Sequence, residues 1–255
     1  MRRVLTIAAM AFTESVRDKI LYSILVFAFA MIGSSTILVT LSVGGEGRIV
    51  KDLGLTCITL CGLFIAVFIG INLVSREIER RTIFSLLSKP VRRAEFLAGK
   101  FLGLGLTLAV NIGVMAAGLM ALAWALEDHW TPRILLAAGF TFLELLILTA
   151  TAILFSAFST PTLSAIYTLL VFVIGRLSAD LMAFAAQFGG ASVKAIVVGL
   201  YYLLPNLSGF NVSGAVVNDL PLDTGTLALT AIYGVLYAAA ILAVAVAVFQ
   251  RRDFR

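Results

Sequence analysis

Some of the residues in this sequence that could do chemistry lie inside long apolar runs. Glu144 stands about ten residues into the run 134–158, so a helix there would carry its carboxyl group near the centre of a bilayer. A charged group at that depth is costly and is commonly functional. Glu144 is therefore a candidate cavity-lining or proton-coupled residue. The structural alternative is a hydrogen bond to a neighbouring helix through Asn111 or a threonine.

Other polar residues fall in such runs as well. Arg176 and Asp180 are four residues apart, so one helix face would carry both. We favour a local ion pair between them over a transport site. Asn72 lies near the inner end of its run and could line an inner entrance to a pathway.

The two cysteines of the chain, Cys57 and Cys61, also share one helix face, about 6 Å apart. Two thiols could contribute to a soft-metal site, but they do not complete one. Buried cysteine in an apolar run more commonly packs as a small hydrophobic residue. We therefore predict neither a metal nor a cofactor for this chain.

The composition determines what must position these residues. The 255 residues are 61% hydrophobic and only 13% charged, whereas a soluble domain has about 25% charged residues. The apolar runs are long enough to cross a bilayer as helices, and they lack the short alternation of barrel strands. The sequence predicts an all-α polytopic membrane protein.

The predicted architecture is a single permease domain over 1–255. An amphipathic helix over 3–19 would lie at the inner interface, and an outer segment, 187–225, would hold a short helix at 192–204 before the last span. Gly99 and Gly103 would let a neighbouring helix approach closely near the inner surface. Six spans are predicted, at about 20–43, 53–75, 97–126, 134–158, 163–186 and 226–249.

Basic residues set the predicted topology. Fourteen of the nineteen Lys and Arg residues lie in the segments 2–19, 76–100 and 251–255, which flank spans. Such residues stay on the cytoplasmic side, so both termini are predicted to be cytoplasmic in a multi-pass protein of a bacterial or archaeal inner membrane. The net charge of +5 is thus explained by topology, and nucleic acid is not an expected partner.

The sequence contains no phosphate-binding loop and no common hydrolase motif. Gly99-Lys100 superficially resembles a phosphate-binding loop, but Ala94 stands where its first glycine would be, and Phe101 replaces the required Ser or Thr. HExxH and GxSxG are also absent. An enzyme working unaided is therefore not expected.

The charged stretch 75–101, SREIERRTIFSLLSKPVRRAEFLAGKF, interrupts the apolar sequence. Its first part predicts a helix that continues the second span and ends at Pro90. The stretch resembles the first cytoplasmic loop of type-2 ABC exporter permeases, with its Glu/Arg-rich turn, Thr-Ile-x-x-Leu-Leu, Pro, basic residues, Glu-Phe and Gly-Lys. The resemblance covers essentially the whole chain. Within the family, the chain most resembles the branch that includes permeases of nitrous-oxide-reductase maturation. Arg81 departs from it, because many relatives have Gly before Thr.

The resemblance implies a non-catalytic subunit of an ATP-driven exporter. Two copies of the permease would work with two ABC ATPase subunits, which bind the ATP and Mg²⁺ and dock on 76–96 and on the N-terminal helix. ATP-driven closure would then open a central path outward. The residues implied in this coupling are Glu77, Arg80, Arg81, Thr82, Phe84 and Leu87.

Two other functions stay open at this point. The permease could transmit ATP-driven motion to a periplasmic partner bound at 187–225 without conducting cargo. Alternatively, a proton-coupled carrier could use Glu144 with Arg176 and Asp180 and need no ATPase. The sequence does not identify the substrate.

Overall fold

The structure is a computed structural model, and it describes residues 2–40, 46–71, 93–127, 131–188 and 190–251. Every regular element within these ranges is helical, which confirms the predicted all-α class. Five helices are long and apolar enough to cross a membrane, or up to seven if two bent pairs each count as a span. The predicted six lies within this range.

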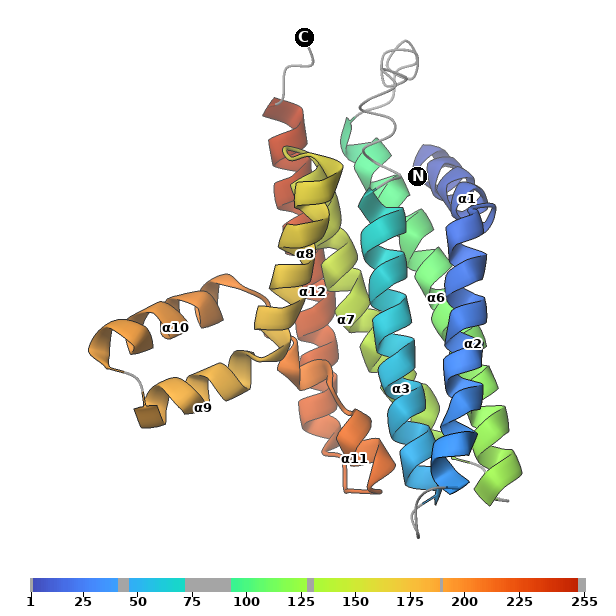
Figure 1. Ribbon diagram of the computed structural model, residues 1–255. Helices are drawn as coiled ribbons and strands as arrows, with labels where there is room; N and C mark the ends of the chain where they lie inside the picture. Colours follow the sequence, from blue (N-terminus) through green and yellow to red (C-terminus); the bar gives the residue numbers. More distant parts are fainter. Residues whose placement is uncertain (1, 41–45, 72–92, 128–130, 189, 252–255) are drawn as a thin grey trace.

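The five long helices form an upright bundle (Figure 1). They are α2 (Lys19–Thr40), α3 (Glu46–Phe64) with its π-helical continuation η1 (Ile65–Ile69), α6 (Arg93–Glu127), α7 (Arg133–Ser156) and α12 (Thr224–Arg251). α3 begins earlier than the span predicted at about 53–75, because residues 46–52 form its first turns. Arg48 and Asp52 are exposed there, so a helix that extends past the apolar run leaves both charges accessible.

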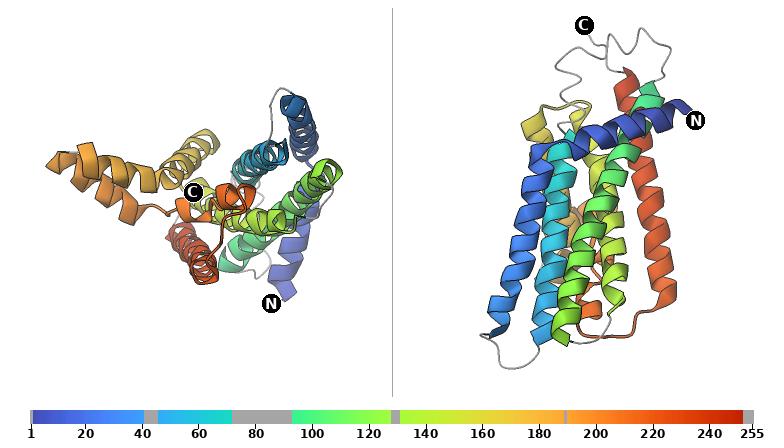
Figure 2. Two further views of the ribbon diagram at one scale, coloured as in Figure 1. Left: turned by 90° about the horizontal axis from the view of Figure 1, so that it is seen from below. Right: turned by 90° about the vertical axis from the view of Figure 1, so that its right-hand side faces the viewer.

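Helices α3 and α7 form the centre of the bundle. In each of these two helices, 67% of the residues in the apolar stretch are buried, against 22% in α2 and in α12. α7 packs against α3, α6, α8 and α12, as the end-on view shows (Figure 2). The large apolar side chains that α2 and α12 leave exposed, such as Val26 and Leu236, suit a lipid environment.

Helix α1 (Arg2–Val16) crosses the end of the bundle at which α12 also ends (Figure 2). It lies on α6 at the two predicted close-approach glycines. A Cβ atom on Gly99 would stand 2.7 Å from the Cβ of Ile7, and one on Gly103 would stand 2.6 Å from the carbonyl oxygen of Ala8. The neighbouring helix that the glycines admit is therefore α1 of the same chain. Lys100, between them, forms an ion pair with Glu14 at 3.5 Å.

The predicted fifth span, 163–186, is not one straight helix. It divides at Leu177 into α8 (Pro161–Arg176) and α9 (Ser178–Phe188), which are bent by 59°. α10 (Ala191–Leu203), which contains the short helix predicted at 192–204, lies beside α9, and the two project from the bundle as a hairpin (Figure 1). The chain returns through the short helices η2 (Ser208–Phe210) and α11 (Ser213–Val217). The second broken pair is α10 with this returning segment, Ser208–Val217, and the two are bent by 60°.

Asp223 caps the first turn of α12. Its carboxylate accepts hydrogen bonds from the hydroxyl and N–H groups of Thr226, at 2.6 and 3.0 Å, and from the N–H of Gly225 at 3.3 Å. These bonds, led by that of the Thr226 hydroxyl, hold the pKa of Asp223 below its ordinary value.

The contact between α1 and the glycines of α6 predicts that a side chain added at these glycines lowers stability more than one added elsewhere on α6. Gly103→Ile should force α1 off α6 and lower the free energy of unfolding by about 1–3 kcal/mol. Gly113→Ile is the matched control, because a Cβ atom on this glycine of the same helix meets nothing within 4 Å. The measurement is reversible unfolding in mixed detergent micelles. Equal losses in the two variants would contradict the α1 contact.

The cap predicts a pH dependence. Because the folded pKa of Asp223 is lowered, its contribution is fully present above the pKa of the unfolded chain and is lost as the pH falls through the folded value. The difference in melting temperature between the wild type and Asp223→Ala should therefore be constant near neutrality and shrink below about pH 4. Asp180→Ala, which removes another exposed aspartate, serves as the control.

Candidate functional site

Glu144 lies midway along α7, about 17 Å from either end of that helix. Its side chain is 1% exposed and lies inside the bundle. Glu144 therefore lies midway along a helix that is long and apolar enough to cross a membrane, and its depth in a bilayer stays a prediction. An ionised carboxylate so enclosed needs a counter-ion and hydrogen-bond donors.

Arg176, the last residue of α8, supplies both. Its Nη1 atom donates to Oε1 of Glu144 at 2.8 Å and to Oε2 at 2.7 Å. The guanidinium also lies over the ring of Phe172, one turn earlier, at 5.8 Å from the ring centroid. The Arg176 side chain remains 25% exposed, so the pair has one enclosed partner and one partner that reaches the surface.

The predicted ion pair between Arg176 and Asp180 is wrong. A four-residue spacing brings two side chains together only on a continuous helix, and α8 ends between them. Asp180 is exposed in the first turn of α9, where no ion pair of this residue is found in the described part of the chain. Arg176 instead pairs across to α7.

The two broken segments cross beside this pair. The N–H of Leu207 donates to the carbonyl of Gly175 at 3.0 Å, and a Cβ atom on Gly175 would stand 2.7 Å from the carbonyl oxygen of Pro205. Gly175 is thus the position at which the second segment can pass the end of α8. Pro205, which follows α10, lacks the N–H that a longer helix would need.

Asn206 joins the elements that meet at the crossing. Its Oδ1 accepts from the hydroxyls of Ser178 and Ser208, at 3.0 and 2.6 Å. Its Nδ2 donates to the Tyr201 hydroxyl at 3.2 Å, and its backbone N–H donates to the Tyr233 hydroxyl at 3.0 Å. Sequence reasoning missed this residue. Pro205-Asn206 between apolar segments was the available signal, but a proline and an amide alone do not reveal their partners.

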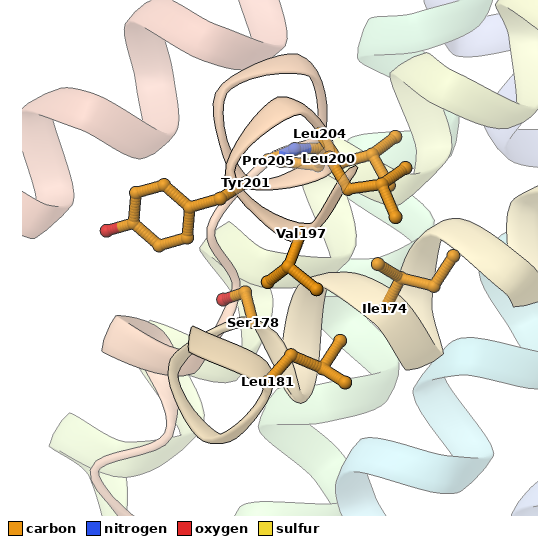
Figure 3. Close-up of a pocket in the computed structure, with 8 residues that line it drawn as sticks. All are labelled: Ile174, Ser178, Leu181, Val197, Leu200, Tyr201, Leu204 and Pro205. Atoms are coloured by element: carbon orange, nitrogen blue, oxygen red, sulfur yellow. The ribbon is translucent and has the colours of Figure 1, made fainter. Parts of the chain in front are cut away.

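The space between the break and the hairpin is packed by apolar side chains. Ile174, Leu181 and Val197 converge there from α8, α9 and α10 (Figure 3). The remaining cavity measures only about 20 Å³, close to the minimum for one water molecule. The break is therefore a packed junction.

A larger groove opens beside Arg176. It measures about 320 Å³ and lies between α3 and α8. Its walls are formed by Thr56, Thr59, Leu60, Phe172, Val173, Arg176 and Leu177. Among the described residues that line it, Arg176 alone is charged.

Of the other predicted polar residues, Asn111 does not join this centre. Asn111 is buried on α6, where its Nδ2 donates to the carbonyl of Thr107 at 2.8 Å and its Oδ1 has no partner within the described residues. Glu144 is held by Arg176 and not by Asn111. Asn72 and the coupling residues Glu77, Arg80, Arg81, Thr82, Phe84 and Leu87 lie outside the described residues.

The two cysteines face each other on α3, with 3.8 Å between their sulfur atoms. The Cys57 thiol also lies 3.7 Å from the carbonyl oxygen of Ala28 on α2. Within the described ranges, no three His, Cys, Asp or Glu side chains are grouped so that they could hold a metal ion. Both thiols pack between helices, consistent with the structural interpretation.

Comparison with known proteins decides the family. A family model described as ABC-2 family transporter protein matches residues 5–254. The chain belongs to the ABC-2 transporter family. The predicted type-2 permease family is thereby confirmed, whereas its nitrous-oxide-reductase branch stays a prediction. A search of curated proteins found no match.

Membership identifies this ABC-2 protein as a multi-pass permease of an ABC transporter. The family implies an ABC ATPase subunit as its partner. The polar centre described above belongs to the membrane subunit and contains no nucleotide-binding motif. It places a charged group, the Arg176 guanidinium anchored by Glu144, beside a groove.

The ion pair makes a prediction about stability. Arg176→Gln leaves Glu144 enclosed without its counter-ion, which should lower the free energy of unfolding by up to about 3–5 kcal/mol, less whatever protonation of Glu144 recovers. The double variant Glu144→Gln/Arg176→Gln should be more stable than Arg176→Gln alone. Unfolding in mixed micelles measures both.

Asp180→Asn is the control for this cycle, because an exposed, unpaired position should change stability by no more than about 0.5 kcal/mol. A double variant no more stable than Arg176→Gln would contradict coupling between Glu144 and Arg176.

Proposed function

We propose that this chain is the membrane-spanning permease subunit of an ATP-driven exporter, in which two copies work with two ATPase subunits to move a substrate outward. The observation that carries the proposal is the family match over residues 5–254, which takes in the charged stretch 75–101. Because that stretch lacks a phosphate-binding loop, ATP and Mg²⁺ would be bound by the partner.

The packing of α1 supports a route for the ATP-driven motion. The proposed docking surfaces are residues 76–96 and α1, and α6 begins at Arg93 within the first of them. α1 rests on the same helix through Gly99 and Gly103. A push on either surface would therefore reach α6, which packs against α7, the helix that carries Glu144.

One observation favours a second candidate. Discontinuous helices that cross at membrane depth are a feature of proton- and ion-coupled carriers, and two broken segments cross here beside Glu144. A carrier of this kind would use Glu144 and need no ATPase. Substrate uptake into vesicles that contain the permease alone, driven by a pH gradient, would support this candidate over the exporter.

The coupling residues provide the test of the exporter. Phe84→Asp and Leu87→Asp should lower the ATPase rate of the reconstituted complex to that of the ATPase alone, because charged groups replace the apolar contacts proposed for docking. Leu220→Asp, an exposed apolar position far along the chain, is the control and should leave stimulation unchanged. Full stimulation in both docking variants would exclude this surface.

A further inference from the structure

The walls of the groove between α3 and α8 are mainly apolar. Leu60, Val173 and Leu177 line it and are each about half exposed, and Phe172 is also a lining residue. Thr56 and Thr59 contribute hydroxyl groups, of which that of Thr59 donates to the carbonyl of Leu55. At about 320 Å³, the groove is at the lower end of the range for small-molecule sites.

Arg176 brings hydrogen-bond donors to this apolar groove. A guanidinium has five N–H groups, and both bonds to Glu144 come from Nη1. Within the described residues, Nε and Nη2 have no acceptor. Donors left over on a cation at membrane depth call for an oxygen acceptor from outside the chain.

The charge around the groove favours an anion. No acidic residue lines the groove within the part of the chain that the structure describes, and the Glu144 side chain is enclosed behind Arg176 at 1% exposure. Glu144 thus holds the guanidinium in place without facing the groove. The ring of Phe172, on α8, lies 5.8 Å from the central carbon of the guanidinium and adds a cation–π contact.

We propose that this groove binds an amphipathic oxyanion, with the charged head on Nε and Nη2 of Arg176 and the apolar tail against Leu60, Val173 and Leu177. A free inorganic anion would fit less well, because it would lose its hydration to one guanidinium that Glu144 already partly neutralises. As a statement about cargo, the proposal rests on the exporter function. As a statement about binding, it can be tested on the permease alone.

The test uses the full chain in phosphatidylcholine nanodiscs, without any ATPase. Leu60→Trp, with both native tryptophans replaced by Phe, reports on the groove. The probes are bromododecyl phosphate and bromododecanol, which quench tryptophan and differ only in the head group. Quenching should saturate, with an affinity about tenfold higher for the phosphate than for the alcohol.

Three variants separate binding from folding. Arg176→Gln should abolish the preference for the phosphate, and so should Glu144→Gln/Arg176→Gln, which leaves no buried charge unpaired. Glu144→Gln keeps the guanidinium and removes its counter-ion, so it should bind the phosphate more tightly than the wild type does. A purely structural role for Arg176 would change stability without changing the ratio of the two affinities.

Four results would overturn the proposal. The first is an unchanged preference for the phosphate probe over the alcohol in both Arg176 variants, and the second is equal affinity of the wild type for the two probes. The third is an absence of quenching, as expected if a second copy of the chain fills the groove. The fourth is binding of inorganic phosphate that is as effective as binding of the phosphate probe. The last would indicate a site for a free anion. Since no ATPase is present, failure of the exporter function would leave this binding result intact.

Discussion

A carboxylate halfway across a bilayer constrains everything around it. Glu144 cannot remain ionised there without a cation and N–H donors, and it obtains both from the last residue of α8. Arg176 can reach it because α8 ends where it does. An uninterrupted helix over 163–186 would have offered Asp180 as a competing partner on the same face. The break and the ion pair are therefore one feature of the fold.

Ending a helix inside a membrane exposes backbone groups that water would otherwise satisfy. Here the second broken segment supplies part of the compensation, because the N–H of Leu207 meets the carbonyl of Gly175. Asn206 then satisfies side chains from α9, α10 and α12 together. Each broken segment depends on the other, which explains why a glycine, a proline and an asparagine occur where the two cross.

The sequence predicted the parts of the fold that depend on local properties. Runs of apolar residues located α2, α6, α7 and α12, and the position of Glu144 within its run gave its depth. The close approach at Gly99 and Gly103 followed from residue size, although the identity of the approaching helix did not. The break at Leu177 could not be predicted in this way, because 163–186 is apolar enough overall to be a span and the partners of Gly175 and Arg176 are about 30 residues distant.

Local sequence properties likewise do not determine the role of a residue in the site. A charged residue in an apolar run indicates function, but its role depends on which of its atoms remain accessible after packing. Glu144 is enclosed, so a cargo in the groove would meet Arg176 and not the carboxylate. Because α6 contacts α1 through Gly99 and Gly103 and also contacts α7, motion of α1 would be transmitted through α6 to the helix that carries Glu144. An exporter built in this way would bind and release its cargo by moving one cation a short distance, while the ion pair with Glu144 kept that cation beside the groove.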